Sequence, residues 1–201
     1  MAPDMPYGYS DLEPVMSHDS LWFHFSRQQH NCFEPMLDRI RGTELDQMDL
    51  RTLIWTVAQA PGRRAVYQYA SGLWNHDMFW RSMRPGGGGR PFGTVAQHIR
   101  LAYGSYERFA TEFQERALML YGNGWLWVTW HASKVGLLTT RNSRPPFLDG
   151  HRVLLALDLW EHAYYLDHQN RRSNYVAGFL ENLVNWNFAN ANLDQQLRLP
   201  G

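Results

Sequence analysis

The hydrophobic pattern of this chain changes character near residue 120. Before that point apolar residues recur every three or four positions, as on one face of a helix, along residues 20–40 and 64–83 for example. After it, three short apolar runs read as strands separated by turns, at residues 125–130, 135–140 and 153–157. The pattern returns to helix from residue 161 to residue 194. This order of predicted elements, with helices before and after a group of strands, predicts an α+β fold.

The sharpest interruption of the chain is Pro85 followed by four glycines. No predicted strand precedes these glycines and no Gly-Lys-Ser/Thr follows them, so they do not form a phosphate-binding loop. We interpret them as a linker and turn. The chain is therefore divided into an N-terminal helical domain (residues 1–85), a glycine-rich linker (86–93) and a C-terminal α+β domain (94–201).

Composition excludes several classes of protein. With 201 residues, of which 44% are hydrophobic, the chain can bury a sizeable core. Its net charge of zero provides no general attraction to nucleic acid or to a membrane surface, and no apolar run approaches the length of a membrane span. Cys32 is the only cysteine, so a disulfide framework is excluded and a reducing compartment fits. At the N-terminus we expect neither a signal peptide nor a presequence.

The third apolar run leads into residues 158–165, which hold two acids, an imidazole and two phenols. A strand that ends at Asp158, with His162 four residues later, would present two metal ligands from a rigid element. The same spacing also suits an Asp158 that caps a helix and a His162 that packs in the core. Spacing alone leaves both interpretations open.

Three histidines, His24, His76 and His162, fall in aromatic surroundings on predicted regular elements. Together with Asp158 they would make a set of three nitrogen ligands and one oxygen ligand, which suits iron or manganese and leaves room for a solvent ligand. Five other histidines lie in more polar contexts and are expected to be ordinary: His30, His98, His131, His151 and His168.

These residues belong to a wider resemblance to the iron/manganese superoxide dismutases, which covers essentially the whole chain. It is carried by Asp158–Tyr165, Trp74–His76 with Phe79–Trp80, Gly122–Trp127, and Met5–Tyr7 with Asp11–Pro14. The resemblance implies an N-terminal helical hairpin and a C-terminal α+β domain with a three-stranded antiparallel sheet. It also implies one iron or manganese ion per chain between the two domains, bound by His24, His76, Asp158 and His162.

The resemblance further implies a hydrogen-bonded proton relay, and here this sequence departs from the family. The position of the family's gate tyrosine holds Cys32, and that of the histidine behind it holds Gln28. The family's glutamine comes from one of two positions, which here hold Gly72 and Ser143. Losing such partners of a metal centre typically costs about 10–100-fold each in affinity or activity. A site of this kind can hold metal and still fail as a dismutase.

Other features of the family are retained. By the resemblance, Trp125 and Trp127 would wall the pocket, and Arg172 stands where the family has an anion-steering arginine. Glu161 would reach the partner's ligand histidine across a dimer axis, and Tyr165 would reach the partner's gate. This predicts a homodimer, or a heterodimer with a related chain.

Two functions follow from this pattern. The first is an active iron or manganese superoxide dismutase, which converts superoxide to oxygen and hydrogen peroxide. The second is a weakly active or inactive protein that serves as a structural subunit of a larger assembly, such as the small subunit of the mitochondrial ribosome. We favour the second, because every relay position changes while the ligands remain. It predicts a mitochondrial location, whereas the enzyme also suits the cytoplasm.

An RNA partner would fit the composition of the basic residues. Lys134 is the only lysine among 19 basic residues, and the rest are arginines, whose planar side chains suit contacts with RNA phosphates or acidic protein neighbours. The second function therefore predicts ribosomal RNA and ribosomal proteins as partners.

Overall fold

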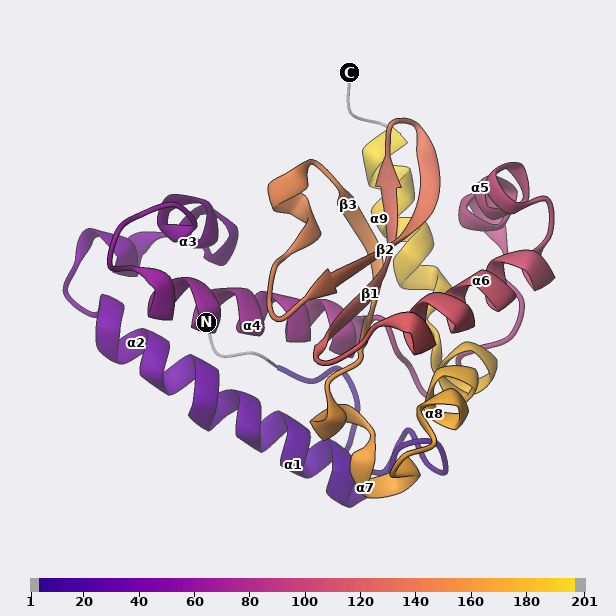
Figure 1. Ribbon diagram of the computed structural model, residues 1–201, viewed down its shortest axis with the longest axis horizontal. Helices are drawn as coiled ribbons and strands as arrows, with labels where there is room; N and C mark the ends of the chain where they lie inside the picture. Colours follow the sequence, from indigo (N-terminus) through magenta and orange to yellow (C-terminus); the bar gives the residue numbers. More distant parts are fainter. Residues whose placement is uncertain (1–3, 198–201) are drawn as a thin grey trace.

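The computed structural model describes residues 4–197. Three strands form its sheet: β1 (Gly124–His131), β2 (Lys134–Arg141) and β3 (Arg152–Asp158). Around them lie the helices α1 (His18–Gln28), α2 (Glu34–Ile40), α3 (Leu50–Val57), α4 (Arg64–Arg81), α5 (Gly93–Tyr103), α6 (Tyr106–Met119), α7 (Tyr165–His168), α8 (Arg172–Gly178) and α9 (Trp186–Leu197) (Figure 1). Within residues 4–197, no helix combines the length and the apolar character that a membrane crossing requires.

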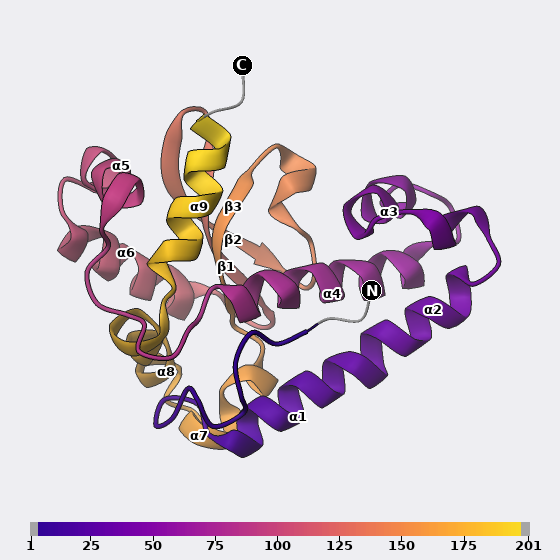
Figure 2. The same cartoon turned by 180° about the vertical axis from the view of Figure 1, so that it is seen from behind.

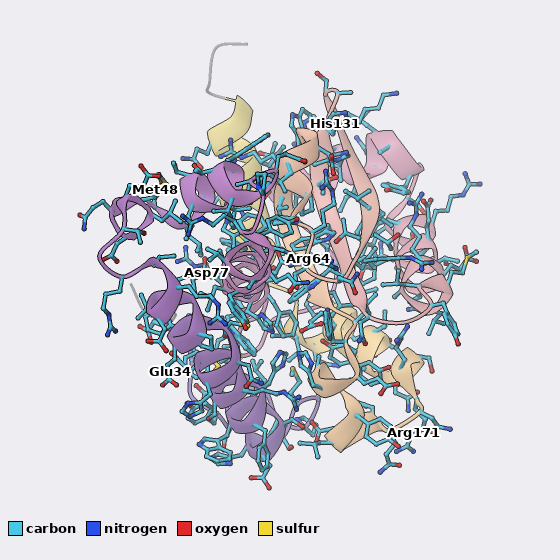
Figure 3. The ribbon with its side chains drawn as sticks, turned by 60° about the vertical axis from the view of Figure 1, so that its left-hand side comes forward. Glu34, Met48, Arg64, Asp77, His131 and Arg171 are labelled. Carbon is cyan, nitrogen blue, oxygen red and sulfur yellow. The ribbon has the colours of Figure 1, made fainter. Side chains whose placement is uncertain are left out.

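The N-terminal half is a helical hairpin, as predicted. A π-helical turn, Gln29–Phe33, joins α1 to α2, so that residues 18–40 form one long rod that runs antiparallel to α4 (Figure 1). Helix α4 is seen end-on in Figure 3, between this rod and the sheet. Asp49 caps α3, because its carboxylate accepts hydrogen bonds from the backbone N–H groups of Arg51 and Thr52.

The C-terminal half is built on a three-stranded antiparallel sheet with the order β2-β1-β3. Helices α4 and α9 pack against β3, whereas α5 and α6 pack against β2 (Figure 2). Asp158 at the end of β3 pairs with Trp125 near the start of β1. Every residue of β3 after Arg152 is buried, so this strand delivers Asp158 into the interior.

The glycine-rich segment is packed along the π-helical turn Phe179–Leu183, which precedes α9. The backbone N–H groups of Gly88 and Gly89 donate to the carbonyl oxygens of Val184 and Leu180, both at 2.9 Å. The indole Nε1 of Trp186 donates to the Gly89 carbonyl, also at 2.9 Å. These bonds fasten the end of the helical hairpin to the C-terminal helices.

Gly88 and Gly86 offer a matched test of this packing. Both have positive φ angles, 81° and 58°, so alanine at either position meets the cost of a left-handed backbone, about 1–2 kcal/mol. An added Cβ at Gly88 would also overlap the backbone of Glu181, whereas at Gly86 nothing lies within 4 Å. We expect Gly86→Ala to lower the free energy of unfolding by about 1–2 kcal/mol and Gly88→Ala by more than about 4 kcal/mol. Urea denaturation measures both, and equal losses would contradict the packing.

Candidate metal centre

The four predicted ligands come from four separate elements. His24 lies on α1 and His76 on α4, both in the helical hairpin. Asp158 is the last residue of β3, and His162 lies in the short 3-10 turn Glu161–Ala163 that follows it. The two halves of the fold therefore contribute two side chains each.

The ligand atoms of these side chains converge on one point. The carboxylate oxygen Oδ2 of Asp158 lies 3.3, 3.5 and 3.4 Å from the Nε2 atoms of His24, His76 and His162. The Nε2 atoms of His24 and His76 are 3.0 Å apart. One ligand atom from each of the four side chains lies within 4.8 Å of the others.

The opposite edges of two ligands are held by the backbone. Nδ1–H of His76 donates to the carbonyl oxygen of Gly72, one turn earlier on α4, at 2.6 Å. This bond places the ring proton on Nδ1 and leaves the Nε2 lone pair free to bind a metal. Oδ1 of Asp158 accepts from the backbone N–H of Trp160 at 2.8 Å, which leaves Oδ2 facing the imidazoles.

At neutral pH, His24, His76 and Asp158 are in the protonation states that metal binding requires. Burial lowers the pKa of the His24 imidazole to about 3, and burial also lowers the pKa of His76. Burial opposes ionisation of Asp158, but its contacts with His162 and His24 outweigh burial and hold the carboxyl pKa well below its ordinary value. Neutral imidazoles beside an ionised carboxylate are the forms that bind a metal ion.

The hydrogen bonding of Asp158 Oδ2 decides whether a metal ion fits this cluster. This oxygen is fully buried, and no donor among the described residues makes a hydrogen bond with it. A buried carboxylate oxygen without such a partner is costly. A metal ion coordinated by Oδ2 and the three Nε2 atoms would satisfy it. The donor set, three nitrogens and one oxygen without thiolate, suits iron or manganese.

The cluster lies at the base of a cavity of about 450 Å³. The indole of Trp80 packs edge-on against the His24 ring at 4.8 Å between ring centroids, and Trp125 packs in the same way against His76 at 5.1 Å. The lining residues Asn31, Asn123 and Glu161 are exposed, so the cavity reaches the surface. The ligands therefore sit in an aromatic shell with one polar approach.

Comparison with known proteins agrees with this geometry. The family model described as "Iron/manganese superoxide dismutases, alpha-hairpin domain" matches residues 1–84. The model described as "Iron/manganese superoxide dismutases, C-terminal domain" matches residues 91–192. The chain belongs to the iron/manganese superoxide dismutase family.

Relatives within this family span nearly the whole chain. A protein named as an iron superoxide dismutase of Synechocystis sp. is 38% identical over 191 residues, which are 95% of this chain and 96% of the relative. A manganese/iron superoxide dismutase of Rickettsia prowazekii is 35% identical over 195 residues, 96% of this chain and 92% of the relative. A chloroplastic iron superoxide dismutase of Arabidopsis thaliana is 36% identical over 189 residues, 94% and 89% of the two chains.

The cofactor predicted for this dismutase-family chain is supported by both results. The cluster of three imidazoles and one carboxylate is of the kind that holds one iron or manganese ion per chain. The relatives are named for iron, or for manganese and iron. The sequence therefore predicted the family, the fold and the metal from residues that the structure brings together.

The four altered relay positions of this superoxide dismutase family member all line the same cavity. Gln28 ends α1 and is 3% exposed, and its Oε1 accepts a hydrogen bond from Trp80 Nε1 at 2.8 Å. Cys32 lies in the π-helical turn, where burial raises the pKa of its thiol to about 11. The backbone carbonyl of Ser143 accepts from Asn75 Nδ2 at 3.2 Å, which ties the loop after β2 to α4. Their roles stay predictions.

Cys32 and Gly72 share one space. A Cβ added at Gly72 would lie 3.2 Å from the Sγ atom of Cys32, closer than an ordinary contact. The thiol therefore occupies the region that a side chain at position 72 would enter. Any larger residue at position 72 requires Cys32 to move.

This contact predicts that substitutions at the two positions are coupled. Glycine inside a helix is typically about 0.5–1 kcal/mol less stable than alanine. We expect Gly72→Ala to raise the free energy of unfolding by about 1 kcal/mol in a Cys32→Ala background. In the original chain we expect Gly72→Ala to raise the free energy of unfolding by less, because the Cys32 thiol must shift. A double-mutant cycle by urea denaturation measures the coupling, and an equal effect in both backgrounds would contradict the shared space.

The residues that the resemblance marks as retained differ in whether they line the cavity. Trp125 lines the cavity, whereas Trp127 lies behind it, stacked on Trp125 at 5.5 Å, and donates from Nε1 to Thr140 at 2.9 Å. Glu161 and Tyr165 are exposed, and Glu161 also lines the cavity.

Arg172 makes its contacts away from the cavity lining. Its guanidinium donates to the Leu120 carbonyl at 2.8 Å and to the Tyr164 hydroxyl at 3.1 Å. These bonds tie the end of α6 to the segment that carries His162. Whether the same arginine also steers anions stays a prediction.

Sequence reasoning did not single out four residues of the cavity wall: Arg27, Asn31, Asn123 and Trp160. Asn123 and Trp160 lie inside the segments that carried the resemblance, so their positions offered a signal. Arg27 and Asn31 directly precede Gln28 and Cys32, Arg27 in α1 and Asn31 in the π-helical turn.

Proposed function

We propose that this protein is an active superoxide dismutase that uses iron or manganese to convert superoxide to oxygen and hydrogen peroxide. The observation that carries the proposal is the buried Oδ2 of Asp158, which faces three imidazole nitrogens and has no hydrogen-bond partner among the described residues. A bound iron or manganese ion supplies one-electron redox chemistry between its +3 and +2 states. The names of the relatives support the same activity.

The surrounding residues keep the site fixed and exclude water from its inner side. Trp80, Trp125 and Phe79 are at most 1% exposed and enclose the ligand imidazoles on their inner side. A low-dielectric wall strengthens the electrostatic interactions of the carboxylate and of a small anionic substrate that enters the cavity. His162, whose side chain is 27% exposed, marks the side on which the substrate approaches.

Forming hydrogen peroxide consumes two protons, and the chain must deliver them without a titrating relay. Gln28 does not ionise, and the Cys32 thiol, with a pKa of about 11, keeps its proton at neutral pH. Both side chains line a cavity that reaches the surface. We infer that the protons come from solvent in this cavity, passed along hydrogen-bonding groups.

We also propose that a second copy of the chain packs against the face that carries Glu161 and Tyr165. Tyr165 is 54% exposed, Leu166 is 57% exposed and Phe23 is 54% exposed, an apolar group on the contacting helices α7 and α1. Such a group on one face supports an interface. Light scattering after size exclusion is expected to give twice the mass of the 23.5 kDa chain.

The structural-subunit interpretation favoured by the sequence analysis is not supported. It depended on the loss of every relay position, but the relatives that match nearly the whole chain are named as superoxide dismutases. The ribosomal partners and mitochondrial location that accompanied it have no support in the structure or in these comparisons.

The test is metal content and superoxide dismutation on the same purified sample. After loading with iron or with manganese, we expect close to one ion per chain and rapid dismutation with at least one of the two metals. The metal-free protein is the matched control and should be inactive. One ion per chain with no dismutation by either metal would overturn the proposal.

A further inference from the structure

Gln28 is a buried side chain of which only half is used. Its Oε1 accepts the indole N–H of Trp80 at 2.8 Å. Since an indole N–H can only donate, the oxygen of the amide must face Trp80, and the NH₂ group must face the other way. The Nε2 atom is buried and has no hydrogen-bond partner among the described residues.

The amide belongs to the wall of the metal cavity. Gln28 lines this cavity together with His24, His76 and His162. It lies four residues after His24, on the same face of α1. The indole that holds its oxygen also packs against the His24 ring. Gln28, Trp80 and the ligand therefore form one packed unit.

The unpaired NH₂ group of Gln28 indicates which kind of ligand the cavity binds. Nε1 of Trp125 is a second buried donor without a partner among the described residues, and it lines the same cavity. Buried donors in native proteins are almost always paired, often by a water molecule or a ligand. Two such donors in one wall call for an acceptor, which is an oxygen of solvent or a small anion.

Gln28 is also the buried amide of this wall. The other amides that line it, Asn31 and Asn123, are exposed, and the wall also includes Gly72 and Ser143. Neither of those side chains can supply an amide N–H. The buried amide donor of the cavity thus comes from α1.

We propose that Gln28 is a positioning residue of the metal centre. Its NH₂ group donates a hydrogen bond to the solvent or small anion held beside the four ligands, and Trp80 keeps the amide in the orientation that allows this. The inference rests on the proposed function, because it concerns the same site. It assigns to α1 the amide that positions 72 and 143 lack.

The test measures anion affinity in the iron-loaded protein, with azide as the probe and its absorbance change as the readout. In Gln28→Glu the side-chain oxygen still accepts from Trp80, but the NH₂ donor is replaced by a negative charge. In Gln28→Met the donor is lost without a charge. We expect the azide dissociation constant to rise about 10–100-fold in Gln28→Glu and about 10-fold in Gln28→Met.

Two further variants isolate the cause. Gln28→His can donate from its ring and is expected to keep azide affinity within about threefold of the original chain. Gln97→Glu makes the same charge change at an exposed position of α5 and should leave affinity unchanged. A purely structural Gln28 would alter melting temperature or metal content but not azide affinity per bound iron.

The outcomes separate this inference from the proposed function. Unchanged azide affinity in both Gln28→Glu and Gln28→Met, at full iron content, would overturn the role of Gln28 and leave the dismutase activity standing. Suppose instead that the original chain binds iron but does not dismutate superoxide, and that the Gln28 variants bind azide more weakly than it does. This result would support the role of Gln28 and overturn the proposed function.

Discussion

The Asp158→Asn variant is expected to bind iron or manganese at least about 100-fold more weakly than the original chain. Asp158 supplies the only negative charge among the four ligands. The backbone N–H of Trp160 donates to Oδ1, so the amide oxygen of asparagine takes that place. The NH₂ group then faces the imidazoles, where it offers no lone pair to a metal. Metal content after dialysis against a metal buffer measures the loss, and dismutation should fall with it.

The matched control for this variant is Asp77→Asn. Asp77, labelled in Figure 3, is the neighbour of His76 on α4, and its carboxylate pairs with Arg81 at 3.2 Å. A partly exposed ion pair of this kind contributes little, so Asp77→Asn should bind metal normally. In Asp158→Asn the new amide NH₂ can donate to the Nε2 lone pair of His76, and the variant is therefore expected to fold. Full metal content in Asp158→Asn would show that the carboxylate is not a ligand.

Removal of the metal is expected to lower the melting temperature by about 8–16 °C. A ligand present at about 1,000 times its dissociation constant stabilises the folded state by about 4 kcal/mol. In a chain of this length, each kcal/mol shifts the melting temperature by about 2–4 °C. Because the ligands come from both halves of the fold, unfolding of either half releases the ion. Calorimetry before and after treatment with a chelator measures the shift.

Asp158→Asn again provides the control. Its melting temperature should not respond to added iron or manganese, since the rise in melting temperature depends on metal binding at this cluster. The same shift in both proteins would place the stabilising metal elsewhere. No shift in the original chain would show that binding at this cluster adds little to the stability of the folded state.

Most of the fold could be predicted from the spacing of apolar residues, because in the strands and long helices this spacing matches the side chains that are buried. The run predicted from Val153 to Leu157 lies within β3, and the helix predicted from Arg64 to Met83 contains α4. Two features did not follow. The π-helical turn Gln29–Phe33 keeps the periodicity of a helix to within one residue, so no pattern marks it. The contacts of Gly88 are made by its backbone, which carries no signal in residue type.

The ligands were predictable because chemistry and resemblance agreed on the same four side chains. The roles of Gln28 and Cys32 were not, because they depend on which atoms remain unpaired after folding. The unpaired Nε2 of Gln28 and the contact between Cys32 and Gly72 are properties of packing between α1 and α4. From the sequence alone, both changes read as losses. The structure shows that the two new side chains occupy the site in a defined way.

The division of the ligands between the two halves has a consequence for how the protein acquires its metal in the cell. A nascent chain presents His24 and His76 first, and two imidazoles alone make a weak site that discriminates poorly among divalent ions. The carboxylate is synthesised only in the last quarter of the chain, and it becomes a ligand only after β3 has joined the sheet. Metal capture is thus a late event in biogenesis. The ion that the protein carries then depends on the metals present where the chain completes its folding.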